Sequence, residues 1–281
     1  MKIHKYFKNL IKFISKGGIK QGGVMYAKIG QIQYGKILEG KNILITGGST
    51  GIGFEIAKKC INEGANVIII GRDKEKLLKA QNELGNEKCN ILEFDMTRFE
   101  EYDSIIDEIA NLCSGKLDYL VNNAGVYIYK EYKEYTMNDY DKIFNTNMKS
   151  IYFLTKKILE KFETLSNILM ISSETSLVGN DGPYGLSKAT LNNYTKGLAK
   201  KLYEDKKYIR VNAILPGATI SQVSDYSKSF EKDQNIYEDN VLGNRILLPE
   251  EIAEVACFLL SDASKCINGQ IIACNEGNIL N

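Results

Sequence analysis

The most informative segment of the sequence is Ile43-Leu44-Ile45-Thr46-Gly47-Gly48-Ser49-Thr50-Gly51-Ile52-Gly53. A short apolar run that stops at glycines predicts a buried strand, and the apolar periodicity that continues to Cys60 predicts a helix. The exposed N–H groups of such a turn, together with the positive end of the helix dipole, favour a phosphate-rich ligand. Glycines at positions 47, 51 and 53 would let the backbone approach a pyrophosphate with no β-carbon in between. The spacing is TGxxxGxG, which differs from the GxGxxG of the common dinucleotide fingerprint.

Length and composition exclude several classes of protein. A chain of 281 residues is most simply one domain with a sizeable core. A formal charge of +1 gives no sign of nucleic-acid binding. No apolar run reaches the ~18 residues of a membrane span, and the N-terminus lacks the apolar core of a signal peptide. We therefore expect a cytoplasmic protein.

The cysteines predict neither a disulfide framework nor a metal site. There are six of them, far apart and without a CxxC pair, and the chain has a single histidine. We expect reduced and mostly buried thiols at Cys60, Cys89, Cys113, Cys257, Cys266 and Cys274.

The first 40 residues differ from the rest of the chain, with eight lysines and one glutamate. At 100° per residue, apolar side chains of residues 3–16 fall on one arc and lysines on the opposite one, which predicts a basic amphipathic helix. Three hypotheses remain open for it: docking on the protein's own body or a sister subunit, peripheral contact with the anionic inner membrane surface, or covering a substrate. Six glycines between residues 17 and 35 predict an irregular arm up to residue 40.

From residue 41 onward, predicted strands and helices alternate. Repeated βα units with apolar strands predict an α/β fold, a doubly wound parallel sheet covered on both faces, with ligands at the carboxyl ends of the strands. The predicted strands are 42–46, 66–71, 90–94, 118–122, 167–172, 209–214 and 270–274. The predicted helices are 52–63, 73–84, 99–113, a long one near 136–162, 184–204 and 249–261.

The end of the second predicted strand indicates the cofactor. An acidic residue at this place favours a ribose 2′-hydroxyl, whereas an arginine accommodates a 2′-phosphate. Here Gly71 occupies the acidic position and Arg72 follows at once, so NADP(H) is preferred and NAD(H) remains possible. The adjacent Asp73 would weaken the attraction of a phosphate.

The third and fourth strands also end in polar or small residues. Asp95, followed by Met96, either accepts from an adenine amino group or satisfies local N–H groups of a turn. The fourth strand ends in Asn122-Asn123-Ala124-Gly125, whose small residues would let the backbone approach a cofactor.

A tyrosine and a lysine form the centre of the predicted catalytic group. Tyr184 and Lys188 are spaced i, i+4 at the start of a predicted helix, so both project from one face. A neighbouring ammonium favours the ionised form of a phenol, which makes the pair a tunable proton donor. Ser173 ends the fifth strand, where its hydroxyl would hold a carbonyl oxygen. Asn147 is an amide in the middle of a long helix, where it would anchor a water linked to the lysine.

With these motifs in order, the chain resembles the short-chain dehydrogenase/reductase family, in its branch with the TGxxxGxG turn. The resemblance runs from about Lys41 to the C-terminus. It implies residues 1–40 as an extension outside the family pattern and residues 41–281 as one Rossmann-like catalytic domain. It rests on Thr46 to Gly53, Asp95, Asn122 to Gly125, Asn147, Ser173, Tyr184-x-x-x-Lys188 and Pro216-Gly217.

The resemblance implies a catalytic tetrad of Asn147, Ser173, Tyr184 and Lys188. The family's serine commonly stands slightly further from its tyrosine than the eleven residues that separate Ser173 from Tyr184. Ser172 and Ser176 are therefore alternatives to Ser173. The implied cofactor contacts are Thr46, Gly47, Ser49, Thr50, Gly51, Ile52, Gly53, Arg72, Asp95, Met96, Asn123, Ala124, Gly125, Tyr184, Lys188, Pro216, Gly217, Thr219 and Ser221.

The implied reaction is reversible hydride transfer between a nicotinamide and a carbonyl or alcohol carbon, without a metal. Tyr184 would exchange the proton, Lys188 would lower its pKa and hold the ribose, and Ser173 would polarise the carbonyl. The substrate is a small carbonyl or alcohol compound: a 3-oxoacyl thioester, a sugar or a small ketone. A non-catalytic NADP sensor or a membrane-attached scaffold is the alternative.

Two regions are expected to surround the substrate, and two helices are expected to join subunits. A mobile lid is predicted over 218–248, with Tyr226, Phe230, Tyr237 and Leu242. We also expect the pocket to be lined by Tyr127, Ile128, Tyr129, Glu174 and Thr175. From the resemblance, the helices near 136–162 and 184–204 would pair across subunits in a homodimer or homotetramer.

Overall fold

The computed structural model describes residues 18–21, 24–27, 35–179, 181–220 and 246–279. It divides into two units, 1–32 and 33–281. The predicted helix over 3–16 lies outside the described residues. Within the first unit, β1 (Gly18–Gln21) pairs antiparallel with β2 (Val24–Ala27), a hairpin that was not predicted within the Gly-rich arm. The β-forming residues Ile19, Val24 and Tyr26 flank a Gly-Gly pair, a pattern typical of a hairpin that the count of glycines obscured.

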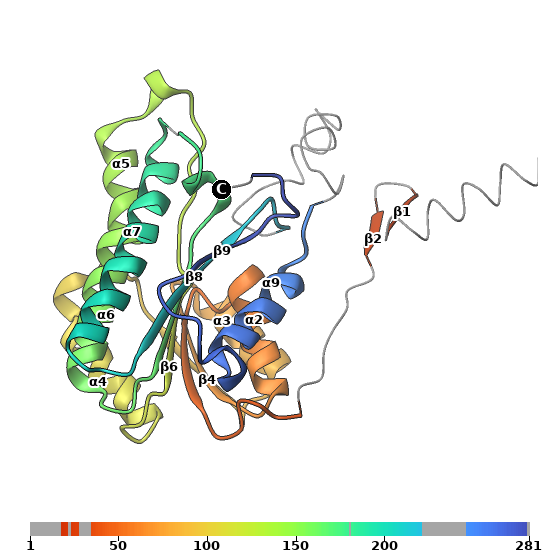
Figure 1. Cartoon of the computed structure of the whole chain (residues 1–281). Coiled ribbons are helices and arrows are strands. Elements are labelled where there is room, and N and C mark those ends of the chain that lie inside the picture. The colour runs from red at the N-terminus through yellow and green to blue at the C-terminus, as the bar shows by residue number, and fades with distance from the viewer. Residues whose placement is uncertain (1–17, 22–23, 28–34, 180, 221–245, 280–281) are drawn as a thin grey trace, which may run out of the picture. The chain divides into compact units, whose positions relative to one another are not determined.

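A parallel sheet of seven strands organises the second unit (Figure 1). Each predicted strand is present, with ends shifted by at most two residues. The strands are β3 (Asn42–Thr46), β4 (Asn66–Gly71), β5 (Cys89–Glu93), β6 (Tyr119–Asn122), β7 (Asn167–Ile171), β8 (Arg210–Pro216) and β9 (Ile271–Cys274).

The strand order is β5-β4-β3-β6-β7-β8-β9, so the direction of winding reverses between β3 and β6. β3 pairs with β4 on one side, at Ile45 opposite Ile69, and with β6 on the other, at Ile45 opposite Val121. Such a reversal leaves a crevice at the carboxyl ends of the two central strands, where ligands bind in open α/β sheets.

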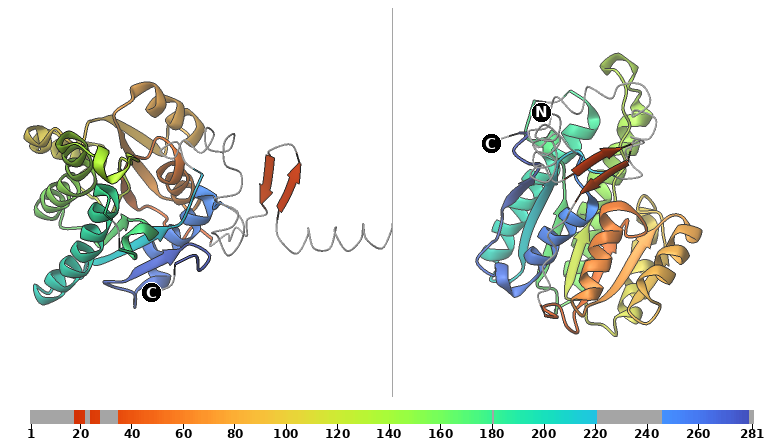
Figure 2. Two further views of the ribbon diagram at one scale, coloured as in Figure 1. Left: turned by 90° about the horizontal axis from the view of Figure 1, so that it is seen from above. Right: turned by 90° about the vertical axis from the view of Figure 1, so that its right-hand side faces the viewer.

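Two hydrophobic clusters cover the two faces of the sheet. Alternate residues of β4 show the division: Val67 and Ile69 belong to one cluster, Ile68 and Ile70 to the other. The helices α2 (Gly51–Asn62), α3 (Lys74–Leu84) and α9 (Pro249–Leu260) cover the first face. The helices α4 (Tyr102–Leu112), α6 (Ser150–Lys161) and α7 (Pro183–Glu204) cover the second, and Figure 2 shows the same layers from two further sides.

The long helix predicted near 136–162 is interrupted. It consists of α5 (Met137–Phe144), a π-helical turn, η3 (Asn145–Lys149), and α6. A π-helical turn inserts one extra residue into the helix and often marks a functional site. Asn147 lies within it, so the backbone departs from the predicted regular helix at the residue singled out as catalytic.

Two further findings concern the ends of the domain. Leu38 is fully buried and its N–H donates to Glu63 O at 3.0 Å, so the packed body extends back at least to Leu38. In the predicted lid, Thr219 bridges to Leu247, while residues 221–245, with all four side chains named for the lid, lie outside the described residues. Within the described residues, no helix combines the length and apolar character needed to span a membrane.

Most of the cysteine side chains are buried, as predicted. Cys60, Cys89, Cys113 and Cys257 are buried, whereas Cys274 is half-buried and Cys266 is exposed.

Candidate active site

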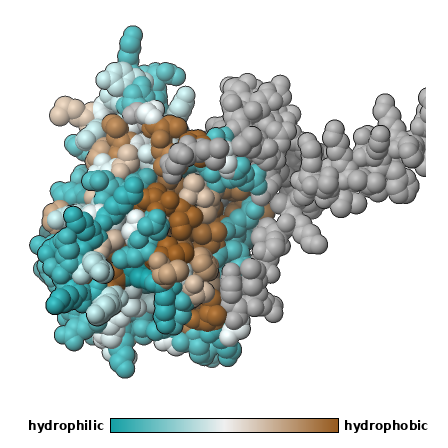
Figure 3. Space-filling view, in the orientation of Figure 1, coloured by the Kyte–Doolittle hydropathy of each residue, from teal (hydrophilic) through white to brown (hydrophobic). Residues whose placement is uncertain are grey.

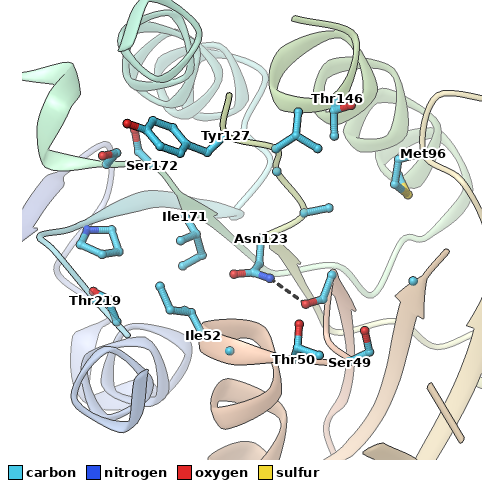
Figure 4. A pocket seen from close by; sticks show the side chains of 18 of the residues that line it. Ser49, Thr50, Ile52, Met96, Asn123, Tyr127, Thr146, Ile171, Ser172 and Thr219 are labelled. Atoms are coloured by element: carbon cyan, nitrogen blue, oxygen red, sulfur yellow. Dashed lines mark hydrogen bonds between the residues drawn. The ribbon is translucent and has the colours of Figure 1, made fainter. Parts of the chain in front are cut away.

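A cavity of about 630 Å³ opens at the carboxyl ends of the strands. Every strand from β3 to β8 contributes the residues that follow it, and α7 contributes Tyr184 and Lys188. In Figure 4, Ser49, Thr50 and Ile52 line one side of the cavity, while Tyr127 and Ser172 lie on the opposite side. A cavity is therefore present at the edge of the sheet where the sequence predicts a ligand site.

The glycine turn owes its shape to positive φ angles at two positions. Gly47 has φ +66° and Gly51 has φ +58°, and both line the cavity. Gly53 does not line it: an added β-carbon there would overlap Asn123 Nδ2 and the Gly47 carbonyl oxygen. The expectation that Gly53 makes room for a ligand is thus corrected, because this glycine makes room for the protein itself. Gly48, which was not singled out, packs its α-carbon against Ile69 in the same way.

The turn is locked to the end of β6. Thr46 Oγ1 accepts hydrogen bonds from the N–H groups of Asn123 at 3.1 Å and Ala124 at 3.0 Å. Asn123 Nδ2 donates to the carbonyl oxygens of Thr46 and Gly47, both at 3.0 Å, and Figure 4 draws a bond from Asn123 as a dashed line. Thr46 is 1% exposed and does not line the cavity, so it supports the turn from below.

Two basic residues lie at the end of β4. Arg72 is exposed and lines the cavity, as does Lys76 one helical turn later. Asp73 is the N-cap of α3 and accepts from Lys76 N at 3.1 Å, so its carboxylate is engaged at the helix end. Lys76 was missed from the sequence, because Arg72 lies before the N-cap of α3 and helical spacing does not relate the two residues.

Asp95 and Met96 line the cavity at the end of β5. Asp95 Oδ1 accepts from Thr97 N at 2.9 Å and Thr97 Oγ1 at 2.8 Å, which is the turn role that the sequence left as one alternative. Burial opposes ionisation of Asp95, but these hydrogen bonds and the nearby Arg72 outweigh it and lower its pKa. The carboxylate is therefore a stable acceptor at the cavity wall.

Lys188 is buried next to Tyr184. Its ammonium group donates to Ile171 O at 2.8 Å and lies 5.8 Å from the centroid of the Tyr184 ring. The residue is 4% exposed, and burial lowers its pKa from 10.5 to about 8. A cation with one protein acceptor in a buried site has strong interactions with any anion or hydroxyl brought near it.

The three candidate serines differ in how their hydroxyls are used. Ser172 Oγ donates to Lys188 O at 3.2 Å, so its proton is engaged. Ser173 Oγ accepts from Thr175 N at 3.3 Å and Thr175 Oγ1 at 3.0 Å, which leaves its own proton for a ligand. Ser176 does not line the cavity, and its Oγ donates to Ser173 O at 2.5 Å. The geometry therefore favours Ser173.

The π-helical turn holds Asn147 fully buried; Asn147 does not itself line the cavity, whereas the preceding residue Thr146 does. Its Oδ1 accepts from Val126 N at 2.8 Å, and its Nδ2 donates to Val126 O at 3.0 Å and Ser187 Oγ at 3.2 Å. Ser187 Oγ donates in turn to Tyr184 O at 2.7 Å, which links the π-helical turn to α7. Only the second lone pair of Oδ1 remains for a water.

Gly125 keeps space between Asn147 and Lys188. A β-carbon added at Gly125 would lie 3.4 Å from Asn147 Oδ1 and 3.6 Å from Lys188 Nζ. Both are ordinary contact distances, so the missing methyl group leaves room for a small polar molecule between the two polar atoms.

The end of β8 closes the cavity. Pro216, Gly217 and Thr219 line it, and Thr219 Oγ1 donates to Gly217 O at 2.8 Å. Ser221 lies outside the described residues.

The predicted substrate side is confirmed in part. Tyr127, Glu174 and Thr175 line the cavity, and the Tyr127 ring packs edge-on against Tyr184 with centroids 4.8 Å apart. Ile128 and Tyr129 do not line it, and Tyr129 is 74% exposed. The prediction is wrong for these two because, in the extended chain after β6, Tyr127 turns to the cavity and the chain then leaves it.

The chain resembles known proteins over most of its length. A family model described as enoyl-(acyl carrier protein) reductase matches residues 47–278. The 3-oxoacyl-[acyl-carrier-protein] reductase FabG of Aquifex aeolicus is 32% identical over 247 residues, which cover 85% of this chain and 98% of the relative.

Two solved structures from Brucella melitensis have a similar fold. One is a short-chain dehydrogenase/reductase described as glucose/ribitol dehydrogenase, with a TM-score of 0.78, 25% identity and coverage of 86% of this chain and 98% of that chain. The other is a 3-ketoacyl-(acyl-carrier-protein) reductase complexed with NADH, with a TM-score of 0.77, 28% identity and coverage of 86% and 100%.

Proposed function

Since the chain belongs to the short-chain dehydrogenase/reductase family, we propose that it is an NADP(H)-preferring ketoreductase whose catalytic groups are Asn147, Ser173, Tyr184 and Lys188. The chain is an oxidoreductase of this family that acts on CH–OH and C=O groups with a nicotinamide cofactor. The observation that carries the residue assignment is the buried Lys188 ammonium beside Tyr184 at the cavity.

The residues at the cavity fit a dinucleotide. The glycine turn precedes α2, whose first N–H groups and dipole suit a pyrophosphate, and the residues at positions 47 and 51 present no β-carbon to it. Pro216, Gly217 and Thr219 would flank the nicotinamide end. When bound, the cofactor supplies or accepts the hydride, and the protein supplies alignment and the proton.

Tyr184 acts as the acid in reduction and as the base in oxidation. Its phenol donates a proton to the carbonyl oxygen as the carbon is reduced, while the Ser173 hydroxyl donates a hydrogen bond to the same oxygen. The engaged hydroxyl of Ser172 supports this assignment to Ser173. Tyr127 restrains the Tyr184 ring by edge-on packing.

Lys188 supports the phenol electrostatically. Its ammonium favours ionised Tyr184 and holds the nicotinamide ribose, and it is fixed by Ile171 O at 2.8 Å. A water between Asn147 Oδ1 and Lys188 Nζ, in the space left by Gly125, would return the proton from solvent.

The cofactor preference rests on Arg72. Gly71 places no carboxylate where it would repel a 2′-phosphate, and Arg72 and Lys76 bring two positive charges to the cavity wall. The carboxylates of Asp73 and Asp95 line the same wall, and Asp73 pairs with Lys76 at 3.9 Å, so they reduce the attraction. NAD(H) remains the alternative cofactor.

Assembly into a homodimer or homotetramer is part of the same proposal. Tyr140, Tyr152, Phe153 and Leu186 on α5, α6 and α7 are each more than 40% exposed, a cluster of large apolar groups on one set of helices. The edge strand β9 offers a second surface, and Figure 3 shows an apolar area on that side of the sheet. Light scattering of the purified protein measures the number of subunits.

We keep the cytoplasm as the proposed compartment and peripheral membrane contact through residues 3–16 as the proposed role of the extension. The support is the basic amphipathic sequence pattern. Co-sedimentation with anionic liposomes, of the full chain against a variant lacking residues 1–40, tests it. Equal binding by both would contradict membrane contact through this segment.

The deciding experiment is titration of cofactor fluorescence with NADPH and NADH, followed by turnover on a panel of carbonyl compounds that includes an acetoacetyl thioester. Tighter binding of NADPH and turnover that disappears in Tyr184→Phe are the expected results. Binding without turnover on any carbonyl would favour the non-catalytic sensor.

A further inference from the structure

A buried carboxylate follows the catalytic serine in the cavity wall. Glu174 comes directly after Ser173 and begins the short helix η4 (Glu174–Ser176). It lines the cavity and is 8% exposed. Asp95 and Asp73 lie at the end of the cavity near Arg72, so Glu174 brings a negative charge to the opposite, catalytic end.

The two oxygens of this carboxylate have different surroundings. Oε2 accepts a hydrogen bond from Asn278 Nδ2 at 3.3 Å. Oε1 faces Gly217, where an added β-carbon would lie 3.4 Å from it. In the described part of the chain, no donor reaches Oε1 and no lysine, arginine or histidine forms an ion pair with Glu174.

The C-terminal turn holds the partner of Oε2 in place. Asn275 is buried and its backbone oxygen accepts from Asn278 N at 3.0 Å, while its side chain bridges Gly277 N at 3.2 Å and Ile279 O at 2.9 Å. Glu174 is therefore braced on one oxygen by an ordered turn, and the other oxygen keeps its hydrogen-bonding capacity.

Oε1 of Glu174 has no donor among the described residues, so a ligand that donates to it would gain a hydrogen bond to a carboxylate without displacing a protein partner. Glu174 directly follows Ser173, and both residues line the cavity.

We propose that Glu174 is a specificity residue that accepts a hydrogen bond from a hydroxyl or ammonium group next to the reacting carbon of the substrate. This rests on the proposed function, whose substrate class it narrows. A hydroxyketone, sugar or amino ketone supplies the required donor. A 3-oxoacyl thioester or a free carboxylic acid presents only acceptors there, and its oxygens would be repelled by the carboxylate.

Matched substrates test this inference. Butan-2-one, 3-hydroxybutan-2-one and 3-aminobutan-2-one differ only at the carbon beside the carbonyl, and an acetoacetyl thioester serves as the acceptor-only case. A hydrogen bond to a charged group predicts that kcat/KM for the hydroxyl and amino compounds exceeds that for the plain ketone by about 10- to 100-fold.

Two variants separate charge from hydrogen bonding. In Glu174→Leu, both preferences should fall to near unity. In Glu174→Gln, which keeps an acceptor oxygen but loses the charge, the preference for the amino compound should collapse, and the preference for the hydroxyl compound should persist in part. Glu276→Gln, in the same C-terminal turn but outside the cavity, is the matched control and should leave both ratios unchanged.

The outcomes are distinguishable. Turnover with ratios near unity in the wild type, or equal ratios in wild type and Glu174→Gln, would overturn the role of Glu174 and leave the ketoreductase standing. No turnover on any carbonyl with either cofactor would overturn the proposed function, and this inference with it. If Glu174→Leu does not fold, the Glu174→Gln ratio for the amino compound alone decides.

Discussion

The proposed cofactor side and the proposed catalytic side of the cavity are built in different ways. On the cofactor side, a contiguous turn supplies the ligand-facing backbone, and Thr46 and Asn123 lock it with four hydrogen bonds of 3.0 or 3.1 Å. On the catalytic side, Asn147, Ser173 and Lys188 come from a π-helical turn, a strand end and a helix. The first side is a property of local chain geometry, and the second exists only when distant segments pack together.

This difference predicts that the two sides fail separately. A substitution at the catalytic side should remove turnover while cofactor still binds, and a substitution in the glycine turn should affect folding and binding together. Four substitutions, at Tyr184, Lys188, Gly53 and Arg72, test this separation.

Tyr184→Phe removes the proposed proton donor and keeps the ring that packs against Tyr127. Loss of a general acid predicts a fall in kcat of about 10³-fold. Fluorescence titration should show a far smaller change in NADPH affinity, because the glycine turn is untouched. A variant that kept its turnover would remove Tyr184 from the mechanism.

Lys188→Met changes stability in a pH-dependent way, in addition to lowering turnover. Burial lowers the pKa of Lys188 to about 8, so between pH 8 and 10.5 the unfolded chain binds more protons than the folded one. The cost of burying the charged lysine is fully present below pH 8 and disappears as pH rises toward 10.5. The wild type should therefore gain up to about 3 kcal/mol of unfolding free energy relative to the variant over this range.

Chemical denaturation at a series of pH values measures the difference in unfolding free energy between the wild type and Lys188→Met. Lys196→Met, at an exposed position on the same helix, is the control and should show a smaller dependence because its ammonium stays in water. A difference in unfolding free energy that stays constant with pH would contradict the lowered pKa of Lys188.

Gly53→Ala tests the cofactor side. The new methyl group would overlap Asn123 Nδ2 and the Gly47 carbonyl oxygen, which are parts of the lock itself. Overpacking predicts a loss of about 2 kcal/mol in unfolding free energy, together with weaker binding of both cofactors. Gly179→Ala, where nothing lies within 4 Å of the added carbon, should be close to neutral. Equal stability of the two variants would show that the hydrogen bonds made by Thr46 and Asn123 adjust to the added methyl group at little cost.

Arg72→Ala tests whether the arginine after β4 determines the preference for NADPH over NADH. Loss of a charge-assisted contact predicts about tenfold weaker NADPH binding, whereas NADH, which lacks the 2′-phosphate, should bind as before. Titration of both cofactors against the same preparation measures the difference. An equal loss of affinity for NADPH and NADH would show that Arg72 does not determine the cofactor preference.

Local signals predicted the elements well where they were strong. Ile43 to Ile45 and Val67 to Ile70 are apolar runs bounded by glycine or polar residues, and the strands begin and end within a residue or two of the expected positions. The hairpin at residues 18–27 was missed because a count of glycines took precedence over the alternating β-formers around them.

The sequence predicted some of the residues at the cavity and missed others. Arg72, Tyr184 and Lys188 line the cavity because strand ends and i, i+4 spacing carry them there. Ser187, Lys76 and the orientation of Tyr127 were not predicted, since each depends on a neighbour supplied by another segment.

The parallel α/β architecture, the glycine turn and the order of the motifs could be predicted from the amino-acid sequence, because strand periodicity, glycine spacing and helical spacing are local properties. The folded structure was needed to show which serine keeps a proton for a ligand, how Asn147 is hydrogen-bonded and which donor reaches Glu174. Burial and hydrogen-bond partners depend on segments that are distant in the sequence: Ser172 donates to Lys188, Asn147 accepts from Val126, and Glu174 accepts from Asn278.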